Sequence, residues 1–84
     1  MFEIRFSKGT IKELKKLPRP ISKRIFEQIS LLQKNPYVRN IKKLAGQPFF
    51  RIRIGDYRVI FEIKKKDLIL FIIKVAHRKK IYKR

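Results

Sequence analysis

The first residues of the chain alternate between apolar and charged side chains. Phe2, Ile4 and Phe6 fall on one side of an extended segment, and Glu3 and Arg5 fall on the other. Alternation with a period of two is typical of a short strand that is buried on one side. The pattern therefore predicts that the chain opens with such a strand.

Two segments with helical spacing follow this strand. Ser7 is a suitable N-cap for the first, whose apolar residues are Ile11, Leu14 and Leu17. Pro18 and Pro20 mark a break, and Pro20 suits the first turn of a second helix. Asn35-Pro36 is expected to end that helix. The apolar stripe of the second helix consists of Ile21, Ile25, Phe26, Ile29 and Leu32.

The second half of the chain returns to a period of two. Residues 49–54 and 57–64 alternate, and Gly55-Asp56 between them is a two-residue hairpin signal. The segment 68–75 is apolar at nearly every position, as in a central strand. Residues 36–48 show no period and are expected to form a loop.

These segments give the order β-α-α-β-β-β within one domain that spans residues 1–84. The fold class expected is α+β, with a mostly antiparallel four-stranded sheet and a helical hairpin packed on one face. We expect the first strand to pair beside the last, because such pairing makes the last strand central.

The charge of the chain indicates its class of partner. The formal net charge is +18, from 24 Lys and Arg against 6 Asp and Glu. A hydrophobic fraction of 44% is enough for a core, so the chain is not a disordered basic tail. Nucleic acid, an acidic protein or an anionic membrane surface could each supply the anion that so basic a domain favours.

Several classes of site are excluded by composition. Without cysteine there is no disulfide and no thiolate metal site, and a single histidine cannot hold zinc alone. No metal and no cofactor is therefore expected. The start of the chain lacks a signal-peptide pattern, and the longest apolar run, 68–73, is too short to span a bilayer. We expect a soluble cytoplasmic protein with no membrane partner.

The arginines of the second half fall in a pattern. Arg51 and Arg53 lie two apart in a strand and share a face, and the hairpin turn brings Arg58 to the same face. The side chains that agree with them in parity are Phe49, Lys64 and Lys74. Arginine offers a planar fork of donors that fits phosphate oxygens in pairs. The pattern indicates an RNA-binding face, although any exposed sheet face also needs polar residues.

Three other side chains each admit two interpretations. Phe49 and Tyr82 could stack on unpaired bases, or they could be an exposed aromatic and a packed tail residue. His77 could be a simple strand-end residue, or it could exchange protons beside a phosphate.

Two motifs resemble those of a known family. Residues 43–48 (KLAGQP) and 50–61 (FRIRIGDYRVIF) look like the central motif of the RelE/ParE toxin superfamily. Residues 75–82 (VAHRKKIY) look like its closing motif. The resemblance covers essentially the whole chain, and the order of the elements agrees with it.

The resemblance implies the toxin of a type II toxin–antitoxin system. RelE-type members are metal-independent endoribonucleases (mRNA interferases). They cut mRNA in the ribosomal A site by attack of a 2′-hydroxyl on the adjacent phosphate, and so inhibit translation. The implied partners are a RelB-like acidic antitoxin, the ribosome and mRNA.

The resemblance also implies roles for particular residues. The catalytic residues it indicates are Arg51, Arg53, Arg58, Arg78 and Tyr82, with His77 sharing acid–base work. The residues expected to contact RNA are Lys43, Phe49, Lys64, Lys74, Lys79 and Lys80. Because the best-known members carry lysine where this chain has Arg51 and Arg53, proton-transfer roles at these two positions stay open.

Two other functions stay open beside the nuclease. The first is a ParE-like toxin that poisons DNA gyrase without cutting RNA, and the second is a basic RNA- or ribosome-binding module without catalysis. The presence of Arg58, Arg78 and Tyr82 favours the nuclease.

Overall fold

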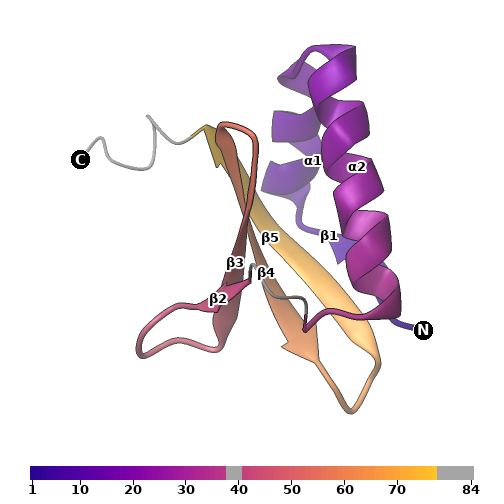
Figure 1. Ribbon diagram of the computed structural model, residues 1–84, viewed down its shortest axis with the longest axis vertical. Coiled ribbons are helices and arrows are strands. Elements are labelled where there is room, and N and C mark those ends of the chain that lie inside the picture. The colour runs from indigo at the N-terminus through magenta and orange to yellow at the C-terminus, as the bar shows by residue number, and fades with distance from the viewer. Residues whose placement is uncertain (38–40, 78–84) are drawn as a thin grey trace.

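The computed structural model describes residues 1–37 and 41–77. It has two layers, a pair of helices and one sheet (Figure 1). In chain order the elements are β1 (Glu3–Phe6), α1 (Lys8–Lys16), α2 (Arg19–Lys34), β2 (Lys42–Lys43), β3 (Phe49–Ile54), β4 (Tyr57–Lys64) and β5 (Ile69–His77). The predicted α+β class and the helical hairpin on one face are confirmed. None of the described helices is long and apolar enough to cross a membrane.

The sheet has the strand order β1-β5-β4-β3-β2. β1 pairs with β5 in parallel, and the other neighbours are antiparallel. The predicted pairing of the first strand with the last is therefore confirmed, and β5 is an inner strand.

The sheet has one strand more than the four expected. Lys42 and Lys43, which fall in the predicted loop 36–48, form β2 and pair with Arg51 and Phe50 of β3. A two-residue strand is too short to show alternation, so the sequence pattern could not reveal it.

Prolines set the ends of both helices. Leu17 and Asn35 each precede a proline and have extended backbone angles (φ −80°, ψ 148° and φ −149°, ψ 98°). A residue before proline is pushed out of the helical region by the proline ring, so each helix stops there. The predicted N-cap is also confirmed, because the Thr10 N–H donates to Ser7 Oγ at 3.1 Å.

The core lies between the helices and the sheet. The buried apolar residues are Leu14, Ile25, Ile29 and Leu32 from the helices and Ile52, Ile54, Val59, Phe61, Leu70, Ile72 and Val75 from the sheet. Most of the predicted stripes are therefore core, whereas Leu17 and Ile21 are partly buried against it, and Ile11 and Phe26 remain exposed by 42% and 45%. The Phe26 ring packs edge to face on Phe6, with the ring centroids 5.8 Å apart.

A β-bulge interrupts the pairing of β4 with β5. Ile60 pairs with Lys74 but Phe61 pairs with Ile72, so Ile73 is an extra residue in β5. The alternation therefore changes phase, and the buried positions run from Leu70 and Ile72 to Val75.

Two side chains of the first helix region fix the backbone at this bulge. The Ser7 hydroxyl donates to the Ile73 carbonyl oxygen at 2.8 Å, and the Thr10 hydroxyl donates to that of Ile72 at 3.2 Å. Without the extra residue, Lys74 would point into the apolar layer.

Candidate nucleic-acid interface

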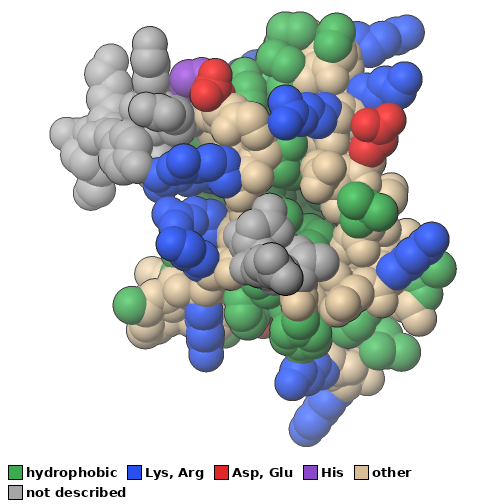
Figure 2. Space-filling view, viewed as in Figure 1, with side chains coloured by type: hydrophobic (Ala, Val, Ile, Leu, Met, Phe, Trp, Pro, Cys, Tyr) green, Lys and Arg blue, Asp and Glu red, His purple; other side chains and the backbone are tan. Residues whose placement is uncertain are grey.

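The face of the sheet opposite the helices, called the open face, carries six of the twelve predicted site residues. Figure 1 shows both helices on the other side of the sheet. By strand register the open face holds Lys42, Phe49, Arg51, Arg53, Arg58, Ile60, Glu62, Lys64, Ile69, Phe71, Lys74 and Ala76, with Glu3 and Arg5 of β1 at its edge. In Figure 2, Lys and Arg side chains line the side of the molecule away from the helices and also project from the helices themselves.

Two arginines face each other across the hairpin. Arg53 and Arg58 are direct partners in the β3–β4 register, close to the Gly55-Asp56 turn. Side chains at such paired positions have Cβ atoms about 5 Å apart, and like charges placed so destabilise a sheet. Two guanidinium groups placed so can both donate to the oxygens of one phosphate.

The next row across the sheet adds further positive charge. Arg51 pairs with Lys42 on one side and with Ile60 on the other, and Ile60 pairs with Lys74. Neighbouring strands are about 4.8 Å apart. The cations of this row therefore lie along one line beside the arginine pair, as a phosphate backbone requires.

The two members of the arginine pair differ in exposure. Arg58 is only 7% exposed and lies on β4 in the middle of the sheet, whereas Arg53 on β3 is exposed. A buried cation is held rigidly by its surroundings and acts in a medium of low dielectric. The pair thus combines a fixed inner cation with an accessible outer one.

The structure brings together the predicted residues Phe49, Arg51, Arg53, Arg58, Lys64 and Lys74. Lys43 is not on this face, because it pairs with Phe50, whose ring stacks on buried Phe61 on the helix side. Lys42 occupies the open face instead. The sequence pattern could not choose between the two lysines within an expected loop.

His77 is also placed away from the arginines. It pairs with Tyr57, and the two rings meet edge to face with centroids 5.1 Å apart. The change of phase at the bulge gives His77 the orientation of Val75, toward the helix layer. The predicted residues Arg78, Lys79, Lys80 and Tyr82 lie outside the described residues.

The sequence pattern did not reveal that an acidic residue of the open face lies between two aromatic residues. Glu62 pairs with Phe49 on one side and with Phe71 on the other. The alternation had placed Glu62 away from the core, but the pairing of Phe71 with it depends on the register that the turn after Lys64 gives to β5. No cluster of three or more His, Asp or Glu suitable for a metal occurs within residues 1–37 and 41–77.

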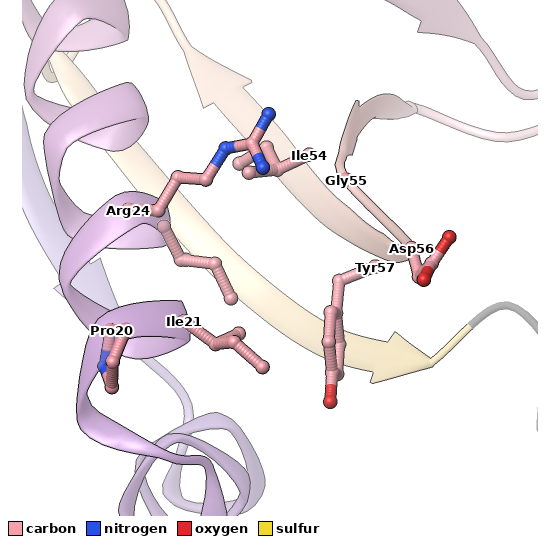
Figure 3. A pocket seen from close by; sticks show the side chains of 8 residues that line it. Pro20, Ile21, Arg24, Ile54, Gly55, Asp56 and Tyr57 are labelled. Atoms are coloured by element: carbon pink, nitrogen blue, oxygen red, sulfur yellow. The ribbon is translucent and has the colours of Figure 1, made fainter.

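A separate hollow of about 420 Å³ lies between α2 and the hairpin turn. Ile21 and Tyr57 reach into it from its two walls, and Arg24 extends from α2 toward Gly55 (Figure 3). Gly55 has φ +60°, and a Cβ there would lie 3.3 Å from Arg24 Nη1. The turn therefore needs glycine both for its backbone angle and for the approach of this arginine.

Known proteins resemble this chain along nearly its whole length. A family model described as the ParE toxin of the type II toxin–antitoxin system parDE matches residues 4–82. Toxin RelE3 of Methanocaldococcus jannaschii is 39% identical over 85 residues, covering 95% of this chain and 94% of that protein.

Two solved structures agree with these matches. The archaeal RelE–RelB complex from Pyrococcus horikoshii matches with a TM-score of 0.82 and 31% identity, covering 92% of this chain and 94% of the other. The RelB–RelE complex from Methanococcus jannaschii matches with a TM-score of 0.76 and 34% identity, covering 93% and 94%. The chain therefore belongs to the RelE/ParE family of toxins of type II toxin–antitoxin systems, and its relatives are of the RelE type.

Proposed function

We propose that this toxin is a metal-independent endoribonuclease that cuts mRNA on the ribosome. The observation that carries the proposal is the Arg53–Arg58 pair, with Arg51 and Lys74 in the next row of the open face. This arrangement concentrates cations on a sheet face that the helices leave uncovered (Figure 2).

The reaction needs no group beyond the RNA and a few side chains. The 2′-hydroxyl gives its proton to a base, and O2′ forms a bond to the adjacent phosphorus. The bond from phosphorus to O5′ breaks, and O5′ takes up a proton. The products are a 2′,3′-cyclic phosphate and a 5′-hydroxyl end.

The arginines would act on the charge that develops during this step. Negative charge grows on the non-bridging oxygens, and preorganised cations stabilise it more in the transition state than in the bound RNA. Arg58 is suited to this role because it is buried, and Arg53 because it can reach a bound strand. Arginine keeps its proton, so the base must be another group, for which we propose Tyr82.

The ribosome would supply what the toxin alone lacks. An extended RNA strand does not hold O2′, phosphorus and O5′ in line, and orienting them lowers a large entropic part of the barrier. The many lysines on the helices would hold the toxin on ribosomal RNA.

The proposal includes an acidic antitoxin of the RelB type. Two relatives are seen in complex with RelB. Exposed Ile11 and Phe26 border a hollow of about 200 Å³ between α1 and α2, amid lysines such as Lys15. An amphipathic acidic helix would match both the apolar and the charged part of this surface.

A cleavage assay and a supercoiling assay together test the function. Purified toxin is added to translating ribosomes, and mRNA ends are mapped; the same protein is added to DNA gyrase. We expect mRNA cut within codons and full gyrase activity. Because the matching family model is that of ParE, loss of supercoiling with intact mRNA would instead support a gyrase toxin.

Two substitutions test the assignment of the tail. Arg78→Ala and Tyr82→Phe are each expected to abolish most cleavage while ribosome binding persists. Full cleavage by both variants would show that the catalytic groups lie elsewhere.

A further inference from the structure

One carboxylate interrupts the positive charge of the open face. Glu62 is on β4, four residues beyond Arg58 and therefore about 13 Å along the strand. A carboxylate beside a phosphate backbone repels it. Glu62 is therefore better suited to meet a base edge than a phosphate.

The neighbours of Glu62 favour a base. Phe49 on β3 and Phe71 on β5 are its direct partners, so an aromatic ring stands on each side of the carboxylate. Both rings are half-buried, with part of their surface accessible on a face that no helix covers. Aromatic side chains on an exposed sheet are platforms on which single-stranded bases stack.

A hollow beside Phe71 has room for a base. It measures about 310 Å³, and its lining residues are Arg5, Lys64, Asp67, Ile69 and Phe71. Its volume is near the lower limit for small-ligand sites, roughly 300 Å³. Phe71 and Ile69 provide an apolar floor, and the cations at its rim could take the phosphate of the same nucleotide.

Glu62 and Arg5 each already have an ion-pair partner, but both pairs are weak. Lys64 Nζ is 3.9 Å from Glu62 Oε1, and Arg5 Nε is 3.0 Å from Glu3 Oε2, with both Arg5 and Glu3 largely exposed. Exposed pairs of this kind contribute little to stability, so a nucleotide can replace them.

The carboxylate selects among the bases by its chemistry. It offers only acceptors, and guanine alone presents two adjacent donors, N1–H and the N2 amino group, on one edge. Adenine and cytosine present one amino group each, and uracil presents an N–H between two repelling carbonyls. A bidentate contact gives the largest discrimination.

We propose that Glu62, between Phe49 and Phe71, selects a guanine that lies a few nucleotides from the bond that is cut. This inference rests on the proposed function for its biological meaning, but the binding it describes can be measured without cleavage. Glu62 is a specificity residue here and takes no part in bond breaking.

The test uses single-stranded 2′-O-methyl decamers, which lack the attacking hydroxyl. One has only uridines, and three carry a single central guanine, adenine or cytosine. We expect the full-length toxin to bind the guanine decamer about tenfold more tightly than the all-uridine decamer. Glu62→Gln should abolish this preference without weakening binding to the all-uridine decamer.

Glu27→Gln is the matched control, because it makes the same chemical change at an exposed position of α2, outside the proposed site, and should keep the guanine preference. Phe71→Leu keeps an apolar side chain but removes the ring, and should weaken the guanine decamer most. The proposal is overturned by equal binding of all four decamers, by a preference that survives Glu62→Gln, or by its loss in Glu27→Gln. An absence of mRNA cleavage in the ribosome assay would reject the nuclease and leave this result unaffected.

Discussion

The two faces of the sheet are made by alternate residues of the same strands, yet they have opposite character. On the helix side, Val59 and Phe61 of β4 are completely buried. On the open face, the residues between and beside them are Arg58, Ile60 and Glu62. Because side chains alternate along a strand, β4 places the residues that stabilise the fold on one face and those of the proposed reaction on the other.

This separation has a physical consequence for substitutions. Burial of apolar surface stabilises the fold from one side, while repelling cations on the other side oppose it. A change on the helix side should lower the free energy of unfolding, and a change at an exposed residue of the open face, such as Arg53 or Lys74, should alter RNA cleavage or binding at little cost to the fold.

The largest effect is expected for Phe61→Ala. Its ring is completely buried and stacks on Phe50, with centroids 6.0 Å apart. Loss of such a side chain lowers the free energy of unfolding by about 3–5 kcal/mol, a large part of the whole for a small domain. Urea denaturation followed by circular dichroism measures it. Phe49→Ala, the same change on the open face, should cost much less, and an equal loss would contradict the comparison.

A large effect on cleavage alone is expected for Arg53→Gln. Its side chain is exposed, so the urea midpoint should hardly change. Loss of one transition-state cation should reduce the rate of mRNA cleavage about 10²-fold. Rates on translating ribosomes measure this. Arg19→Gln on α2, also exposed, is the control and should cut at the wild-type rate.

An intermediate effect is expected for Ser7→Ala, because Ser7 connects α1 with the bulge in β5. The Ser7 hydroxyl caps α1 and donates to the Ile73 carbonyl oxygen in the bulge. Its loss should lower the free energy of unfolding by about 1–2 kcal/mol. Thermal denaturation measures this loss, with Ser30→Ala, at an exposed position of α2, as the control. Equal losses in both variants would show that the hydrogen bonds of Ser7 do not stabilise the bulge.

The smallest effect is expected for Lys74→Gln. Removing one phosphate contact should reduce the slope of log K against log salt concentration by about 0.7 to 1, while the fold is unchanged. Fluorescence anisotropy with a uridine decamer at several salt concentrations measures the slope. Lys12→Gln on α1 should leave this slope as in the wild type. A similar reduction in Lys12→Gln would show that the RNA contacts the helices as much as the open face.

The fold could be predicted from sequence because its signals are local and repeated. The proline breaks, the apolar stripes and the Gly55-Asp56 turn each act within a few residues, and the structure confirms them. The sequence could not show the two-residue strand at Lys42–Lys43, whose pairing depends on a distant partner.

The candidate site could be predicted only in part, for a similar reason. Arg51, Arg53 and Arg58 follow from simple alternation across a tight turn. The orientation of His77 depends on the extra residue in β5, and no pattern in an almost uniformly apolar strand reveals such a residue. The roles of Arg78 and Tyr82 stay predictions.

The bulge also divides β5 into two parts that should open at different rates. Before it, β5 residues 69–72 pair with both β1 and β4, whereas within the described residues 74–77 pair only with β4. Regions with fewer partners open more readily in the native state. Backbone amides of Val75 and His77 should therefore exchange with deuterium faster than those of Leu70 and Ile72. Ala76, the β5 partner of Arg58, lies in the part that should open first, whereas β5 residues 69–72, held between β1 and β4, should stay closed longer.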